Sequence, residues 1–166
     1  MRVDNLIQSF APGATPDGEA TDARPLEGLR RLSRVAAIQV LYQAAMTSST
    51  VDSVAAQFEQ HRIGETIDGL NLTLDRPFFR RLTSGIAADA VGLTGVVQQH
   101  LHKRDVSRLE YVLQAVLIAG SYELTALRDV PARSTIDEYT EIAAAFFDDG
   151  ELSLIHISEP TRPIHI

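Results

Sequence analysis

The stretch RRLSRVAAIQVLYQ, residues 30–43, decides the fold. Its arginines share one arc of a helical wheel: Arg30, Arg31 and Arg34. Residues 35–42 are apolar on nearly every side except at Gln39. This pattern is typical of a helix that starts in solvent and continues among other helices. Because proline suits a first helical turn, the sequence predicts a helix from about Pro25 to Thr47.

Two further helices are predicted in the middle of the chain. Apolar residues recur at helical spacing over about 50–64, at positions 51, 54, 55 and 58. A loop or short turn is expected over 65–74. Asp75 is placed to cap a third helix. This helix should run over about 76–101, with a bend or break near Gly92 because glycine weakens helices.

The last two predicted helices each begin with S/T-x-x-E, the pattern of a capping box. Ser107 and Glu110 mark the start of the fourth helix, which should end near Leu127. Thr135 and Glu138 mark the start of the fifth. The fifth helix is expected to bury five residues: Ile136, Tyr139, Ile142, Ala143 and Phe146. Strand signals are essentially absent, so the sequence predicts an all-α antiparallel helical bundle.

The composition is that of a globular protein. The chain has 166 residues, 45% of them hydrophobic, enough for one compact domain with its own core. Residues 1–24 combine prolines, glycines and acids with little periodicity, which indicates a disordered tail. No apolar run approaches the roughly 20 residues of a membrane span, and no secretion signal stands at the N-terminus. A cytoplasmic protein without membrane contact is therefore expected.

The sequence offers no sign of catalysis, a cofactor or a metal. There is no cysteine, which excludes disulfides and thiolate sites. His100 and His102 are two residues apart on a predicted helix, so they point to different sides and make a poor metal pair. Phosphate-binding, dinucleotide-binding and hydrolase motifs are also missing. We therefore expect a protein that is not an enzyme.

The net charge of −7 argues against non-specific binding of nucleic acid, which needs a positive surface. Three basic groups nevertheless stand out: Arg30, Arg31 and Arg34; Arg76, Arg80 and Arg81; and Lys103, Arg104 and Arg108. For the first group, a solvated helix face and a binding surface fit the spacing equally well. Arginines are mildly disfavoured at a helix N-terminus, which favours a function there. For the third group, a solvated loop is the simpler interpretation.

With its helices placed, the chain resembles the NusB family of bacterial transcription antitermination factors. Three segments carry the resemblance, in the right order and at the right spacing. They are RRLSRVAAIQVLYQ; FFRRLTSGI, residues 78–86; and AGSYEL followed by DVPARSTIDEYTEIAAAFF, residues 119–147. The similarity covers about 30–151. It implies a bundle of two packed helical subdomains.

The resemblance also implies a function. The family binds the boxA element of ribosomal RNA operon transcripts together with the ribosomal protein NusE, within an antitermination complex on RNA polymerase. On the matching positions, Arg30, Arg31 and Arg34 would hold phosphates. Tyr42 would lie near the RNA and partner surface, although a packed core tyrosine fits equally well, and His100 would stack on a base. Gln114 and Ile118 stand where relatives often carry arginine, so part of the family's basic surface is missing.

After Glu151 the chain departs from the family. Relatives continue into a last helix of the type F-V-N-G-V-L-D, whereas this chain reads LSLIHISEPTRPIHI. That segment resembles a translated sequencing adapter, so we interpret 152–166 as a non-native read-through tail and 25–151 as the RNA-binding domain. A chain cut at this point leaves two alternatives open. One is the N-terminal domain of an RNA cytosine methyltransferase, and the other is a helical module that binds only protein.

Overall fold

The computed structural model describes residues 25–63, 66–67, 70–71 and 73–146. Over these residues the fold is of the all-helical class, as predicted. The helices are α2 (Pro25–Thr47), α3 (Val51–His61), α4 (Arg76–Ala88), α5 (Ala90–His100), α6 (Tyr111–Ala126) and α7 (Ala132–Phe146), with a short 3-10 helix η1 (Val106–Arg108). The chain divides into two compact units, Met1–Ala88 and Asp89–Ile166. The predicted tails over 1–24 and 152–166 lie outside the described residues.

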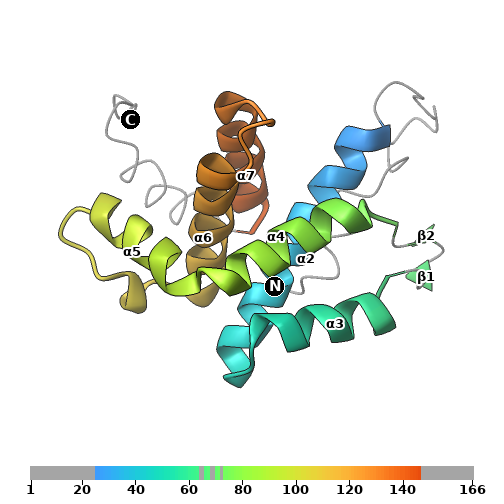
Figure 1. Ribbon diagram of the computed structural model, residues 1–166, viewed down its shortest axis with the longest axis horizontal. Helices are drawn as coiled ribbons and strands as arrows, with labels where there is room; N and C mark the ends of the chain where they lie inside the picture. The colour runs from blue at the N-terminus through green and yellow to red at the C-terminus, as the bar shows by residue number, and fades with distance from the viewer. Residues whose placement is uncertain (1–24, 64–65, 68–69, 72, 147–166) are drawn as a thin grey trace. The chain divides into compact units, whose positions relative to one another are not determined.

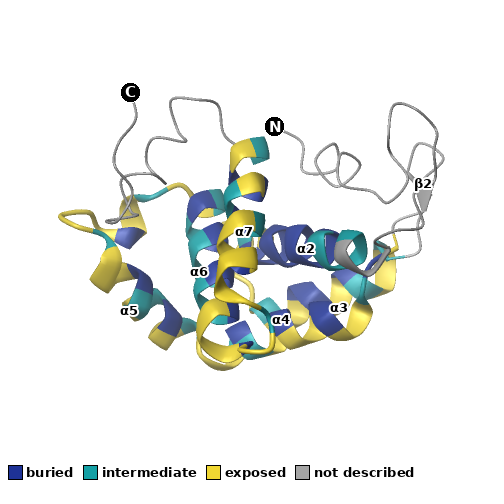
Figure 2. Ribbon diagram, turned by 90° about the horizontal axis from the view of Figure 1, so that it is seen from above, coloured by how far each residue is buried: buried dark blue, intermediate teal, exposed yellow. Residues whose placement is uncertain are grey.

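The first unit is built from α2, α3 and α4, each of which packs against the other two (Figure 1). The predicted bounds of α2 are confirmed, and every residue over 32–41 is buried (Figure 2). The rings of Phe58 on α3 and Phe79 on α4 are tilted by 31° with their centres 5.5 Å apart. This aromatic pair lies in the core, because Phe58 is 4% exposed and Phe79 is fully buried.

Between α3 and α4, the segment predicted as a loop contains a minimal antiparallel hairpin. Strands β1 (Thr66–Ile67) and β2 (Leu70–Asn71) pair with Thr66 opposite Asn71. Each strand has only two residues, so the hairpin leaves the helical class of the fold unchanged.

The predicted third helix is broken into two, as expected, but the break falls at Asp89 rather than at Gly92. Asp89 leaves the helical conformation, with φ −137° and ψ 36°, and α5 starts at the next residue. A Cβ atom on Gly92 would collide with the Asp89 carboxylate. The glycine therefore leaves room for that carboxylate to fold over the first turn of α5.

In the second unit, α6 packs against both α5 and α7, and η1 packs against α5. Apolar residues of α6 and α7 are buried there: Leu113, Val116, Ala119, Ile142 and Ala143. Gly120 of α6 lies directly against Tyr139 of α7, because a Cβ atom on the glycine would be 3.5 Å from the tyrosine Cγ.

Both predicted capping boxes are wrong. Ser107 lies in η1 and binds Asp105, so α6 begins only at Tyr111, and Glu110 makes no side-chain capping bond. Thr135 lies inside α7, where its hydroxyl donates to the Pro131 carbonyl oxygen at 3.4 Å. The predicted buried face of α7 is confirmed in part. Three of its apolar positions are buried as predicted, but Ile136 is 45% exposed.

None of the helices in the part of the chain that the structure describes is both long and apolar enough to cross a membrane.

Candidate nucleic-acid interface

Two of the arginines at the start of α2 converge on one aromatic ring of α4. The Cζ atom of Arg30 lies 5.0 Å from the centre of the Phe78 ring, and the Cζ atom of Arg34 lies 5.1 Å from it. Both distances are within the roughly 6 Å over which a ring face attracts a guanidinium group. Phe78 therefore holds two positive charges that lie one helical turn apart on α2.

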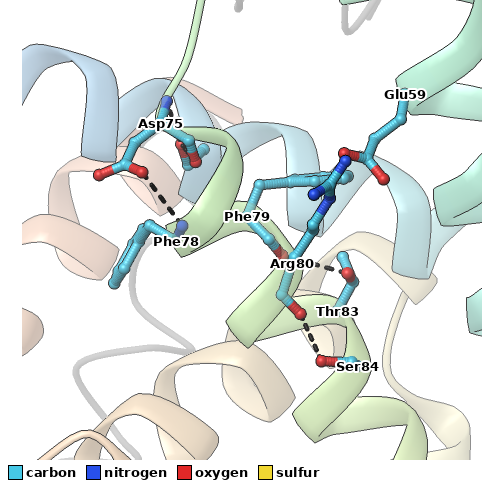
Figure 3. Close-up of polar contacts among 8 residues, drawn as sticks. Glu59, Asp75, Phe78, Phe79, Arg80, Thr83 and Ser84 are labelled. Atoms are coloured by element: carbon cyan, nitrogen blue, oxygen red, sulfur yellow. Dashed lines mark hydrogen bonds and ion pairs between the residues drawn. The ribbon is translucent and has the colours of Figure 1, made fainter.

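Asp75 fixes the start of α4 against α2 (Figure 3). Its Oδ1 accepts a hydrogen bond from the backbone N–H of Phe78 at 3.1 Å, which confirms the predicted helix cap. The backbone N–H of Asp75 donates to the Ser33 hydroxyl of α2 at 3.0 Å. Its second carboxylate oxygen, Oδ2, lies 3.8 Å from Arg30 Nε. One residue thus caps α4, joins the two helices and places a negative charge beside Arg30.

The three arginines differ in exposure. Arg34 is only 4% exposed, so the expectation that all three lie on one solvated arc is wrong for this residue. The side chain of Arg30 is 32% exposed although its Nε is buried, and Arg31 is half-buried. Arg30 and Arg31 therefore present the solvent-accessible part of this cluster, while the contact with Phe78 and the burial make Arg34 part of the packing.

The second basic group lies on α4. Arg76, Arg80 and Arg81 are all exposed. Arg80 donates from Nε to Oε1 of Glu59 on α3 at 2.7 Å, and Figure 3 shows this pair on the far side of Phe79 from Asp75. The charge of Arg80 is therefore already matched by an acid within the unit.

Tyr42 lies on the same helix as the arginine cluster. It follows Arg31 by 11 positions, which places the two residues about 20° apart around the helix axis and about 16 Å apart along it. Tyr42 is half-buried, so its ring is packed on one side and accessible on another. Arg31 and Tyr42 thus lie along one face of α2.

His100 belongs to the second unit, where it ends α5. Its side chain is exposed, and Nδ1 lies 2.8 Å from the Val96 carbonyl oxygen. A carbonyl oxygen only accepts, so Nδ1 is the donor in this contact. In α6, Gln114 donates from Nε2 to the Leu109 carbonyl oxygen at 2.8 Å. The Gln114 side chain therefore fixes the residues that lead into α6.

Among the described residues, no group of three or more histidines, cysteines or acids is placed to hold a metal ion.

Comparison with known proteins decides the relationship. The profile of the NusB family matches residues 31–155. This chain belongs to the NusB family. It is 40% identical over 129 residues to the transcription antitermination protein NusB of Rhizobium johnstonii, a match that covers 76% of this chain and 81% of that protein. It is 35% identical over 144 residues to NusB of Brucella ovis, covering 85% and 84% respectively.

The fold agrees with this assignment. The solved structure of T. maritima NusB superimposes with a TM-score of 0.61 at 25% sequence identity, over 81% of this chain and 93% of that one. The chain is thus a NusB-family transcription antitermination protein, and the family is one of antitermination factors rather than enzymes.

Proposed function

We propose that this chain binds the boxA element of ribosomal RNA operon transcripts together with the ribosomal protein NusE, as part of an antitermination complex on RNA polymerase. Membership of the NusB family supports this proposal. The observation that carries it is the arginine cluster of α2. Phe78 and Asp75 hold the inner side of Arg30, while about a third of its side chain remains accessible. A guanidinium group held in this way suits a phosphate oxygen, because its planar donors are already oriented.

The negative net charge of this chain is the reason to propose a basic protein as its partner. The chain carries a net charge of −7, and the structure uses several of its arginines internally: Arg34 against Phe78, Arg62 against Phe58 and Arg80 against Glu59. Phosphate binding requires a net positive surface. We therefore propose that a basic ribosomal protein supplies the missing positive surface, and that the two proteins bind RNA jointly.

The joint surface is tested by titrating labelled boxA RNA with this chain, alone and in the presence of NusE, at fixed salt. We expect modest affinity for the chain alone and clearly higher affinity for the pair, because the partner adds cations beside the RNA. A single-stranded RNA of unrelated sequence serves as the control. Equal affinities with and without the partner would contradict the joint surface. No RNA binding in either titration would favour the protein-only module.

The arginine cluster is tested with the double variant Arg30→Ala, Arg31→Ala. Each phosphate contact that is lost should lower the slope of log affinity against log salt by about 0.7 on single-stranded RNA. The double variant should therefore lower it by about 1.4, in proportion to two lost contacts. Binding is measured between about 50 and 200 mM salt, because affinity that rests on phosphate contacts falls steeply over this range.

The control is the double variant Arg76→Ala, Arg80→Ala. It removes the same charge from exposed positions of the same unit, so its salt slope should stay close to that of the unchanged chain. If the two double variants lose the same slope, the effect is one of net charge and Arg30 and Arg31 do not contact phosphate.

A further inference from the structure

The segment between α5 and α6 gathers cations that the fold leaves unpaired. Lys103, Arg104 and Arg108 are all exposed. Within the described part of the chain, none of these three side chains forms an ion pair. In the first unit, Arg30, Arg34, Arg62 and Arg80 each lie against an acid or an aromatic ring. The segment between α5 and α6 differs from these positions because three exposed cations without an ion pair follow one another closely along the chain.

The segment has a fixed shape, because Gln98 of α5 clamps it with both ends of its side-chain amide. Nε2 of Gln98 donates to the Arg104 carbonyl oxygen at 2.7 Å, and Oε1 accepts from the backbone N–H of Val106 at 2.9 Å. Val106 is 7% exposed and anchors the segment in the unit. Such a clamp reduces the conformational freedom that a ligand would otherwise have to remove on binding.

Lys103 stands at the turn of this segment with φ 60°. A residue with a side chain rarely adopts this left-handed conformation, and structures that hold one there do so with surrounding contacts. Here the bond from Gln98 to the next carbonyl, that of Arg104, supplies such a contact. Lys103 thus directly precedes a residue whose backbone is bound to α5.

The one acid between His100 and Arg108 is Asp105, which caps the short helix η1. Oδ1 of Asp105 accepts hydrogen bonds from the backbone N–H and the hydroxyl of Ser107, at 2.9 and 2.8 Å. These two bonds hold the pKa of the Asp105 carboxyl below its ordinary value. Burial opposes them in part, and the positive charge of Arg108 lowers the pKa further. Asp105 therefore caps η1, and the segment as a whole remains positive.

We propose that Lys103, Arg104 and Arg108 form a second phosphate-binding surface, which binds the backbone of single-stranded RNA. This proposal rests on the proposed function. Phosphate is the chemistry that matches it, because arginine offers planar donor pairs to phosphate oxygens and lysine a mobile point charge. The exposed His100, at the end of α5, lies next to this segment along the chain, where an imidazole can stack on a base of the same strand.

The test compares two double variants of the full chain in complex with NusE. Arg104→Ala, Arg108→Ala removes two cations of the segment. Arg128→Ala, Arg133→Ala removes two exposed arginines from elsewhere in the same unit. Binding of single-stranded boxA RNA is measured as a function of salt. We expect the first variant to lower the slope of log affinity against log salt by about 1.4, at about 0.7 for each contact, and the second to leave it nearly unchanged.

Thermal melting of both variants checks that neither change unfolds the chain, which exposed positions should not do. Equal slopes for the two variants, with RNA binding intact, would overturn the second surface and leave the proposed function standing. Absence of RNA binding by the unchanged chain with NusE would overturn both. A fall in slope confined to the Arg104 and Arg108 variant would support this surface specifically.

Discussion

Replacing Phe79 by alanine should lower the free energy of unfolding by about 3–5 kcal/mol. The ring is fully buried and contacts the ring of Phe58, with 5.5 Å between their centres. Truncation removes the buried apolar surface and leaves a cavity that the surrounding helices fill only in part. Small proteins have only about 5–15 kcal/mol of stability in total, so this one change should remove a large share of it.

Urea unfolding followed by circular dichroism measures the effect. Arg76→Ala, three residues earlier on α4 and exposed, is the matched control and should stay within about 0.5 kcal/mol of the unchanged chain. If Phe79→Ala and Arg76→Ala unfold at the same urea concentration, Phe79 does not belong to the core that the structure places around it.

The stability of the chain should rise when Gly120 is replaced by a residue with a small side chain and fall when it is replaced by one with a large side chain. A Cβ atom there would lie 3.5 Å from Cγ and 3.6 Å from Cδ2 of Tyr139, which is ordinary van der Waals contact. Gly120→Ala should therefore fit, and it should stabilise α6 by about 0.5–1 kcal/mol because glycine weakens a helix interior. Gly120→Leu would push its further carbons into the Tyr139 ring and should cost about 1–3 kcal/mol.

Thermal melting of the two variants measures both effects. Gly120→Ala should raise the melting temperature of the chain, and Gly120→Leu should lower it. A leucine tolerated as well as alanine would mean that α6 and α7 are not in close contact at this point. The double variant Gly120→Leu, Tyr139→Ala should recover part of the loss, because it removes the ring that the leucine meets.

Periodicity predicted the helices of this chain well where they carry a continuous apolar pattern. The bounds of α2 follow from the proline at its start and the apolar run after the arginines, and α3 follows from four apolar residues at helical spacing. The capping boxes failed because a capping box is a local motif that competes with other local bonds. Asp105 binds Ser107 instead, and the helix begins at Tyr111, four residues after the expected cap.

Local sequence patterns did not predict the contacts within the candidate interface, because these contacts join residues that are far apart in the sequence. The arginine cluster was visible in the sequence, but its surroundings were not. Asp75 was predicted only as a helix cap, and Phe78 only as part of a family motif. Their contacts with Arg30 join residues more than 40 positions apart, and only the packing of α4 on α2 creates them. For the same reason the sequence did not reveal that Arg34 is buried.

Asp75 also limits how this protein can vary. Asparagine, serine and threonine can cap a helix as aspartate does, but none of them carries the charge that lies beside Arg30. Glutamate carries the charge, but it is not among the residues that cap well. The residue at position 75 therefore has to cap α4 and also carry a negative charge. A substitution that keeps the cap and the stability of the fold can still disturb Arg30 by removing this charge. Position 75 should accordingly tolerate fewer residue types than its partial exposure alone would allow.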